Sequence, residues 1–350
     1  MSGIQGPAVF MAQFLRDEEP FCSAESIGGW FANLGYTGVQ VPAWDKRVFD
    51  LDQAANSVDY CDDYRGRMGE LGLQVTELAA HLQGQVLAMH PAYAEGFAGF
   101  HPPGLSDAQR TEWAAGELEK CILASFNMGL RHIPVLSGGF AWHLAYPWPQ
   151  RPPGLIDEAF QELASRWMPL LDLAEERGCV FGYELHPGSD LFDGATFEAF
   201  LDETGAHEAA GINYDPSHFV LQQLDYLQFI ELYGDRICGF HVKDAEFHPN
   251  GRVGVYGGYQ PWSGRAGRFR SLGDGQVDFK RVFTLLTEAG YQGWAVLEWE
   301  CCVKSPAQGA AEGAPFITRH LIEPTEVAFD DFAGGESDSA AHRRMLGLDD

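Results

Sequence analysis

Acidic and imidazole side chains stand at the ends of four apolar runs, and together they could hold a metal ion. The runs and their side chains are 179–184 with Glu184, 210–214 with Asp215, 236–242 with His241, and 294–298 with Glu298. Three carboxylates and one imidazole form an oxygen-rich ligand set that suits Mn²⁺, Mg²⁺ or Co²⁺. A charge left unpaired after a buried strand is costly, and a cation offsets that cost. The residue types therefore predict one divalent ion bound by this set.

The elements that position these side chains alternate between short apolar runs and longer amphipathic segments, as in repeated βα units. The expected strands are 8–15, 38–42, 73–80, 131–136, 179–184, 210–214, 236–242 and 294–298. The clearest expected helix is 106–129, because Ser106 and Gln109 have capping-box spacing and Gly129 is a typical helix stop.

This pattern predicts an α/β fold, a (β/α)8 TIM barrel with long βα loops. An open doubly wound sheet is the alternative, but no GxGxxG motif follows the first strand, and polar residues gather at strand carboxyl ends along the whole chain. A barrel gathers those ends at one mouth. We assign 1–305 to the barrel and 306–350 to a C-terminal helix and surface extension, with a polar segment at 331–341.

Three stretches are too long to be simple connections, namely 84–105, 137–156 and 245–276. Loops of such length in a compact domain are usually functional, and on a barrel they stand over the active-site mouth. The last stretch carries the aromatic residues Tyr256, Tyr259 and Trp262.

Composition narrows the class of partner. The chain has 350 residues, with 23 Lys and Arg against 50 Asp and Glu, and its formal charge is −27. Such a surface repels phosphate backbones and anionic lipids, which argues against nucleic-acid and membrane partners. The seven cysteines form no CxxC pair, and no apolar stretch is long enough to span a bilayer. We expect an unprocessed protein of the reducing cytoplasm.

Five ordered motifs resemble the xylose isomerase-like TIM-barrel superfamily. They are Tyr-Glu-Leu-His-Pro at 183–187, Asn-Tyr-Asp-Pro-Ser-His at 213–218, Phe-His-Val-Lys-Asp at 240–244, Leu-Gly-Asp-Gly-Gln-Val-Asp-Phe at 272–279, and Val-Leu-Glu-Trp-Glu at 296–300. The superfamily includes sugar phosphate isomerases and epimerases, ketose 3-epimerases, inosose dehydratases, C-glycoside deglycosidase barrel subunits and apurinic endonucleases.

The resemblance implies roles for the ligand set. In ketose 3-epimerases the matching residues bind one Mn²⁺ or similar ion, and the two glutamates also move the proton, so Glu184 and Glu298 are the expected catalytic residues. Removing a proton next to a carbonyl builds an enediolate, whose charge a divalent ion stabilises. The implied activity is a metal-dependent sugar isomerase or epimerase acting through a metal-bound enediolate.

Further residues are candidates for binding the substrate. His218 follows Asp215 by three residues, as the substrate-binding His of the family does, and each candidate, His218 included, has a structural role as its alternative. The substrate-binding candidates are His218, His186, Arg270, Lys243, His81 and His143. Glu300 is the alternative metal ligand if the strand end at Glu298 is misplaced.

Three other functions compete with the isomerase. An endonuclease of this superfamily needs an Asp-x-His before Ser-Leu-Gly, whereas this chain has Gly-Arg-Phe-Arg at 267–270. A lyase is the main alternative, because β-elimination on a 3-keto sugar or inosose, as in a dehydratase or C-glycoside deglycosidase, starts from the same proton abstraction. A non-catalytic sugar-binding barrel is disfavoured because every expected ligand is present.

The expected substrate is a neutral sugar or keto-sugar. Arginines and glycines in 245–276 leave a phosphate site open, but the segment after the last strand begins Trp-Glu-Cys-Cys at 299–302 and offers no glycine turn. A homo-oligomer is expected, with a small β-rich partner subunit if the protein is a deglycosidase.

Overall fold

A parallel eight-stranded sheet forms the centre of the computed structural model, which describes residues 3–257, 259–325 and 338–348. Its strands are β1 (Gln5–Phe10), β2 (Gly38–Pro42), β3 (Gln74–Ala79), β4 (His132–Val135), β5 (Val180–Glu184), β6 (Ala210–Tyr214), β7 (Ile237–Val242) and β10 (Trp294–Leu297). Their order is β3-β2-β1-β10-β7-β6-β5-β4. The two end strands lie beside each other, and the N–H of Ala80 donates to the Pro134 carbonyl oxygen at 2.8 Å. The sheet is therefore a nearly closed barrel, as predicted.

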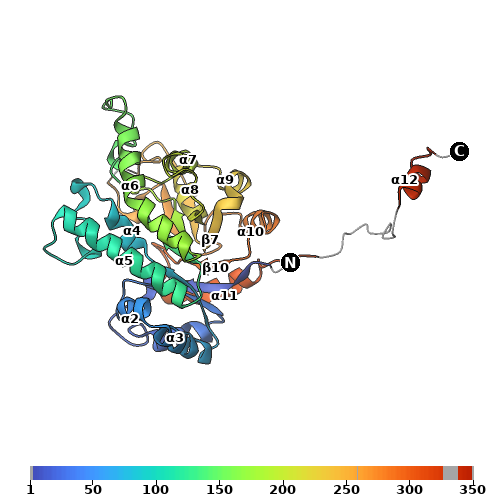
Figure 1. Ribbon diagram of the computed structural model, residues 1–350, viewed down its shortest axis with the longest axis horizontal. Helices are drawn as coiled ribbons and strands as arrows, with labels where there is room; N and C mark the ends of the chain where they lie inside the picture. Colours follow the sequence, from blue (N-terminus) through green and yellow to red (C-terminus); the bar gives the residue numbers. More distant parts are fainter. Residues whose placement is uncertain (1–2, 258, 326–337, 349–350) are drawn as a thin grey trace.

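Helices wrap the outside of the strands (Figure 1). They are α1 (Ala24–Asn33), α2 (Leu51–Asn56), α3 (Val58–Glu70), α4 (His81–Leu87), α5 (Asp107–Asn127), α6 (Leu155–Glu176), α7 (Gly194–Glu203), α8 (Pro216–Gln222), α9 (Tyr226–Tyr233), α10 (Phe279–Glu288) and α11 (Pro306–Thr318). The expected helix at 106–129 is α5. Its capping box between Ser106 and Gln109 is present, and Gly129 follows its end with φ +67°. This confirms the helix predicted there.

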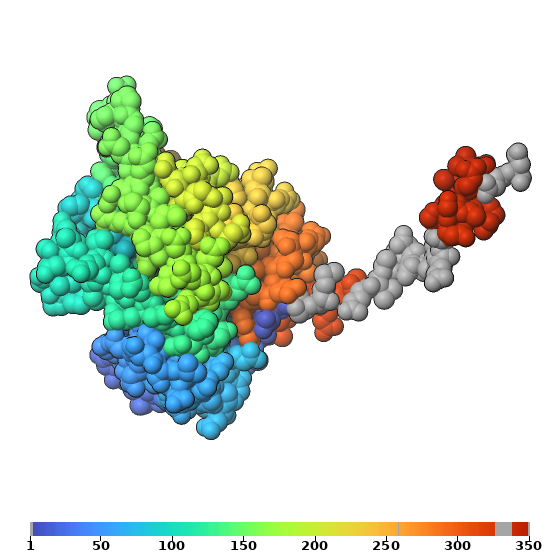
Figure 2. All heavy atoms as spheres, in the orientation of Figure 1, coloured from blue at the N-terminus to red at the C-terminus, as the bar shows by residue number. Residues whose placement is uncertain are grey.

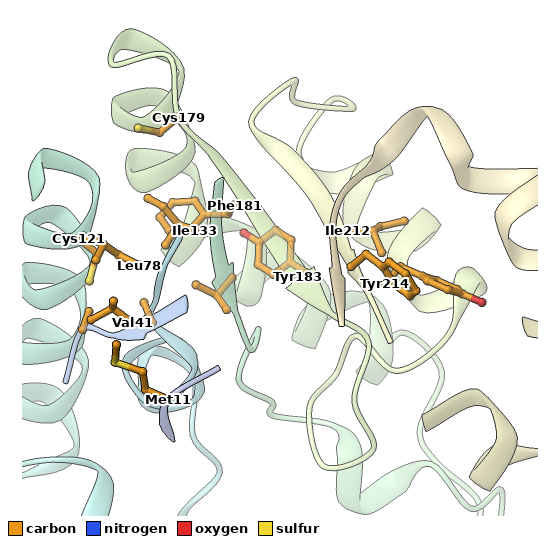
Figure 3. Close-up of a cluster of buried hydrophobic side chains, with 14 of the residues drawn as sticks. Met11, Val41, Leu78, Cys121, Ile133, Cys179, Phe181, Tyr183, Ile212 and Tyr214 are labelled. Atoms are coloured by element: carbon orange, nitrogen blue, oxygen red, sulfur yellow. The ribbon is translucent and has the colours of Figure 1, made fainter. Parts of the chain in front are cut away.

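Outward-facing strand side chains build the main core against these helices (Figure 3). Val41, Leu78 and Phe181 are fully buried in this layer, and the thiol of Cys121 packs among them. The inward face of the barrel is different, because polar side chains such as Gln40 and His241 lie there beside the ring of Phe10. A Cβ at Gly239 would overlap Asn213 Oδ1, so this glycine gives the polar side chain its room.

Several expected boundaries were wrong. The first strand, expected at 8–15, is β1 and ends at Phe10, because the chain turns at once into a 3-10 helix, Ala12–Phe14. The expected loop 245–276 contains an antiparallel hairpin of β8 (Asp244–Phe247) and β9 (Gly267–Arg270). The stretch 84–105 begins inside α4 and carries two further 3-10 turns, Pro91–Tyr93 and Ala98–Phe100. The stretch 137–156 carries a 3-10 turn at Trp142–Leu144.

The C-terminal helix expected after residue 306 is α11, and it packs on β1 and β10. Ile317 is fully buried there, and Gly309 lies against the indole of Trp299. This helix therefore joins the outer layer of the barrel. Most of the polar segment 331–341 lies outside the described residues, and its last three residues begin the short helix α12 (Ser339–Met345).

The segment before α6 projects from the surface of the barrel. Figure 2 shows the amino-terminal end of α6 and the segment before it extending from the body of the molecule. Tyr146 and Trp148 in that segment are 55% and 74% exposed, so large aromatic side chains face outward there. Within the described part of the chain, every helix is too short or too polar to cross a bilayer.

Candidate metal and sugar site

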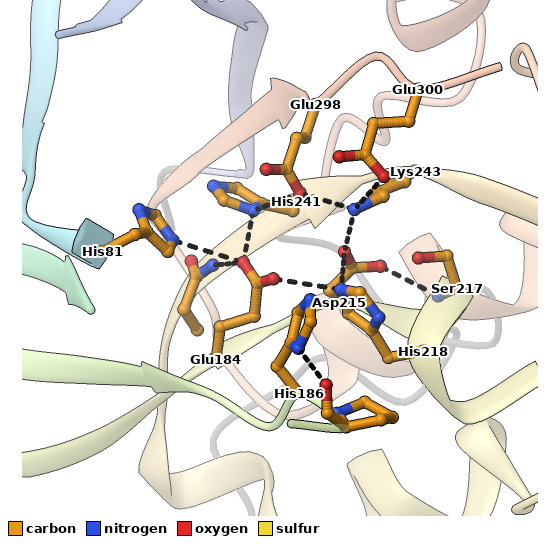
Figure 4. A network of polar contacts seen from close by, with 12 residues as sticks. His81, Glu184, His186, Asp215, Ser217, His218, His241, Lys243, Glu298 and Glu300 are labelled. Carbon is orange, nitrogen blue, oxygen red and sulfur yellow. Dashed lines mark hydrogen bonds and ion pairs between the residues drawn. The ribbon is translucent and has the colours of Figure 1, made fainter. Parts of the chain in front are cut away.

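The four predicted metal ligands meet at the carboxyl ends of their strands (Figure 4). Glu184 ends β5, His241 is the penultimate residue of β7, and Asp215 and Glu298 directly follow β6 and β10. All four side chains are buried, and each contributes a ligand atom within 4.8 Å of the other three. The strands bring them together because their carboxyl ends all open at one mouth.

His241 lies between the two glutamates. Its Nδ1 is 2.9 Å from Glu184 Oε2 and 3.2 Å from Glu298 Oε2. Burial disfavours the charged imidazole, but the charges of Glu298 and Glu184 outweigh burial and raise the pKa of His241 to about 10. The imidazole therefore carries positive charge when these carboxylates are its partners.

Glu184 is held by several polar groups. His218 Nε2 lies 3.0 Å from Glu184 Oε1, His81 Nε2 lies 3.3 Å from Oε2, and Asn213 donates to Oε2 at 3.2 Å. Burial opposes ionisation of Glu184, yet the hydrogen bonds from these imidazoles and from His241 hold its pKa well below the ordinary value. Glu184 is thus a carboxylate in a fixed orientation.

Glu298 has a different set of partners. Lys243 Nζ lies 3.1 Å from Glu298 Oε2, and Gln13 donates to the other oxygen at 3.0 Å. Burial would raise the pKa of Glu298, but Lys243 and His241 lower it below the ordinary value. Lys243 Nζ is also 3.1 Å from Glu300 Oε2, and Glu300 lies outside the four-ligand set. The last barrel strand therefore ends next to Glu298, and Glu298 rather than Glu300 lies in the group of four candidate ligands.

The donor set fits a divalent cation. Asp215 caps α8 by accepting a hydrogen bond from the Ser217 N–H through Oδ1 at 2.8 Å. Its second oxygen, Oδ2, lies 3.3 Å from His218 Nε2 and 3.6 Å from Lys243 Nζ. The fit rests on the ligand set itself, because three buried carboxylates and one imidazole within reach of one another suit a divalent ion. Glu184 also shares two smaller groups that could hold an ion, one with His81 and His241 and one with His186 and His218.

A cavity of about 460 Å³ opens beside this cluster. Its lining residues are Gln13, His186, Trp262, Phe269, Trp299, Glu300, Cys301 and Cys302. Gln13 and Glu300 contact the cluster directly, and the His186 ring lies 4.2 Å from that of His218. The volume is within the range of small-molecule sites, about 300–1,000 Å³. Aromatic walls suit the C–H faces of a sugar, and polar groups suit its hydroxyls.

The substrate-binding candidates fall into two groups. His81, His186, His218 and Lys243 lie at the cluster or its cavity. Arg270 Nη1 is instead 2.6 Å from Glu246 Oε2, within the β8–β9 hairpin. His143 is exposed, and its ring lies 4.1 Å from that of His90.

Three polar side chains at the site were missed from the sequence. They are Gln13, Gln40 and Asn213. Gln40 and Asn213 each interrupt an apolar strand, and a buried amide in such a strand requires hydrogen-bond partners. That signal was present. Gln13 could not be placed, since the expected strand ran through it.

Comparison with known proteins gives the chain its relatives. An inosose dehydratase from Geobacillus thermodenitrificans is 29% identical over 196 residues, which cover 55% of this chain and 65% of that protein. The next relatives are matched over only about half of their length, 52%. Solved structures share the fold. A 3-keto-D-glucoside 4-epimerase from E. coli has a TM-score of 0.60 at 16% identity, covering 89% of this chain and 98% of that one.

A metal-containing neighbour also shares the fold. A xylose isomerase-like TIM barrel protein from Mycobacterium smegmatis in complex with magnesium has a TM-score of 0.59 at 16% identity, covering 91% of this chain and 96% of that one. The family profile described as xylose isomerase-like TIM barrel matches residues 29–320. This match shows that the chain, with its barrel and its strand-end carboxylates, belongs to the xylose isomerase-like TIM barrel family.

Proposed function

We propose that this protein is a metal-dependent enzyme that removes a proton next to a carbonyl of a neutral sugar or keto-sugar and thereby isomerises or epimerises it. The observation that carries the proposal is the placement of Glu184 and Glu298. They come from β5 and β10, which are not adjacent, and both reach His241 Nδ1 within hydrogen-bond distance. Two carboxylates therefore approach one small volume from different sides.

Such an arrangement suits proton transfer. A divalent ion held by the four ligands, with Mn²⁺ the first choice and Mg²⁺ or Co²⁺ as alternatives, would stabilise negative charge developing on the sugar oxygens. One glutamate takes the proton from carbon and the other returns it, each contributing roughly 10²–10⁴-fold to the rate. His218 and Lys243 hold the two carboxylates in position, and the cavity aromatics exclude water from the sugar face.

β-Elimination is the second candidate, and a specific observation favours it. Several curated relatives of this chain are inosose dehydratases. Elimination begins with the same proton abstraction and differs in the departure of a group from the neighbouring carbon. A dehydratase or a C-glycoside deglycosidase would use the same two glutamates, and the deglycosidase would add a small β-rich partner subunit.

Deuterium exchange separates these outcomes. Metal-loaded protein is incubated in D₂O with ketoses, 3-keto sugars and inososes, and the products are analysed by NMR and mass spectrometry. An isomerase or epimerase yields a deuterated sugar isomer, whereas a lyase yields a product that has lost water or an aglycone. Metal-loaded protein that exchanges no carbon-bound hydrogen in any of the three classes would contradict the proposal.

A further inference from the structure

A buried glutamine on the far side of the barrel contacts the metal-ligand histidine. Gln40 is the one side chain of β2 with a hydrogen-bonding group, and it is 1% exposed. Its Oε1 lies 3.0 Å from His241 Nε2, and its Nε2 donates to Glu77 Oε2 at 3.3 Å. β2 and β7 are separated in the sheet by β1 and β10. The contact therefore crosses the barrel interior.

The direction of these hydrogen bonds follows from the chemistry of the amide. A glutamine has one acceptor oxygen and one donor nitrogen, and the carboxylate of Glu77 accepts. The nitrogen must then face Glu77, and the oxygen must face His241. An amide oxygen only accepts, so the imidazole carries a hydrogen on Nε2. A metal ion would then displace the hydrogen on the other nitrogen, Nδ1, which faces Glu184 and Glu298, and bind its lone pair.

The ring plane of His241 is fixed as well. Phe10 of β1 stacks against the imidazole with a centroid separation of 5.8 Å and an interplanar angle of 27°. Phe10 is 2% exposed, so the ring has little space in which to turn. The remaining freedom of the imidazole is its tautomer, which the amide sets.

We propose that Gln40 and Glu77 are positioning residues that hold His241 in the tautomer and orientation needed to bind the metal through Nδ1. The inference rests on the proposed metal site but not on the substrate. Partners behind a metal-binding imidazole increase its basicity and remove its rotational freedom, and losing one costs roughly 10–100-fold in metal affinity. Gln40 and Glu77 touch neither the cavity nor the other ligands in the described contacts.

The test compares metal affinity across three variants by titration calorimetry with Mn²⁺. Gln40→Met keeps the volume but removes the acceptor, and we expect the dissociation constant to rise roughly 10–100-fold. The matched control is Gln83→Met, because Gln83 is also fully buried but neither of its amide atoms has a hydrogen-bond partner. That control should bind Mn²⁺ as the unaltered protein does.

A swap of the two residues provides the rescue. In Gln40→Glu combined with Glu77→Gln, the carboxylate accepts from His241 Nε2 and the new amide donates to the carboxylate. The order of charges is reversed but every hydrogen bond is kept, so affinity should recover to within a few-fold of the unaltered protein. If Gln40 only filled space, Gln40→Met would bind Mn²⁺ with unchanged affinity, and the double swap would not improve it.

The outcomes separate this inference from the function. Melting temperatures of the metal-free variants identify any that fail to fold. If Gln40→Met does not fold, the metal affinity of the double swap still tests the inference. Unchanged affinity in a folded Gln40→Met, or no recovery in a folded double swap, overturns the positioning role while leaving the proposed function standing. Absence of Mn²⁺, Mg²⁺ and Co²⁺ binding by the unaltered protein would overturn both.

Discussion

The two candidate bases differ in the cations beside them. Glu184 faces imidazoles, whereas Glu298 faces Lys243, and both have pKa values below the ordinary range. Replacing either by glutamine keeps the volume but removes a base and a charge. We expect kcat to fall by roughly 10²–10⁴-fold in each variant, with weaker metal binding and an unchanged circular dichroism spectrum. Steady-state kinetics and metal titration of the two proteins provide the measurement.

Glu300→Gln is the control variant for the substitutions at Glu184 and Glu298. The Glu300 carboxylate contacts Lys243 but lies outside the four-ligand set. Glu300→Gln should therefore keep one bound ion per chain, even where it changes kcat or KM. A glutamine variant of Glu184 or Glu298 that retained the kcat of the unaltered protein would show that glutamate to be a bystander.

Strand-end residues were predictable from the sequence, whereas their partners were not. A carboxylate that directly follows an apolar strand can be recognised in the sequence, because a buried charge is costly unless a cation or a donor compensates it. Glu184 and Glu298 were predicted on this basis. Gln40 shows the limit. Alternation along β2 assigns its side chain a face, but the partner on β7 is 201 residues away and depends on how the barrel closes. The pairing of Arg270 with Glu246 could not be predicted either, since it requires a hairpin that the loop composition did not reveal.

At the scale of elements, the β8–β9 hairpin connects an ion-pair cluster to the cavity. Glu246 pairs with both Arg268 and Arg270 and is 5% exposed. The same hairpin carries Phe269, whose ring lies 4.3 Å from Lys243 Nζ and lines the cavity. Glu246→Gln weakens both pairs, so we expect KM to rise several-fold with a smaller change in kcat.

The control for the hairpin is an ion pair elsewhere. Glu25→Gln removes the partner of Arg67 on the exposed face of α1 and α3, and exposed pairs contribute little, about 0–1 kcal/mol. It should leave both kinetic constants unchanged. Equal effects of the two substitutions on KM would mean that the hairpin does not shape the substrate site.

The first residue of β4 makes stability depend on pH. Burial, with a contribution from Arg131, lowers the pKa of His132 to about 4. The unfolded chain has the ordinary value, about 6.5, so it binds the proton first as the pH falls. The stability that the folded protein gains by keeping His132 neutral is therefore fully present above pH about 6.5 and is lost as the pH falls towards about 4. Between about pH 7.5 and about pH 5 it amounts to at most about 2 kcal/mol of unfolding free energy.

Urea unfolding at those two pH values tests the assignment. His132→Gln removes the titrating group but keeps a polar side chain of similar reach. The variant should lose less stability than the unaltered protein when the pH is lowered, while the two proteins differ little in their urea m-values. An identical pH dependence in both proteins would assign the acid sensitivity to other groups.

Elements with a local signal were predicted well, and those set by tertiary pairing were not. The capping box and glycine stop of α5 lie within the sequence of the helix itself, so its boundaries were found within two residues. The hairpin strands carry charged residues, Glu246, Arg268 and Arg270, at positions that look polar and loop-like. Their ion pairs across the hairpin stabilise strands that composition alone assigns to a loop.

For the whole molecule, the repeated βα pattern predicted a barrel, although not how it closes. The parallel order of the eight strands follows from connections that pass through helices. The join between β3 and β4 relies on a backbone hydrogen bond just beyond the strand, at Ala80. A contact of this kind depends on the accumulated twist and stagger of all the strands, which no single segment encodes.

The charge of the molecule and the lining of its cavity both support the proposed neutral substrate. The formal charge is −27, and among the described residues the cavity lining contains Glu300 but neither lysine nor arginine. Three basic groups near the cavity are paired with carboxylates, because Lys243 contacts Glu298 and Glu300, and Arg268 and Arg270 contact Glu246. A phosphate dianion would therefore enter against the field of the protein and meet neither lysine nor arginine among the described lining residues.

We accordingly expect a neutral sugar to be preferred over its phosphate ester by at least about tenfold in kcat/KM, which corresponds to about 1.4 kcal/mol in the transition state. The measurement is a pair of kcat/KM values for one free sugar and its phosphate, at low and high salt. Added salt screens long-range repulsion, so the discrimination should narrow but persist, because the missing cationic partner is local to the cavity. Preference for the phosphate at both salt concentrations would require a cationic group to reach the cavity on substrate binding. Arg270 would be the first residue to substitute, since it lies next to Phe269 in the cavity wall and needs only to exchange Glu246 for the ligand.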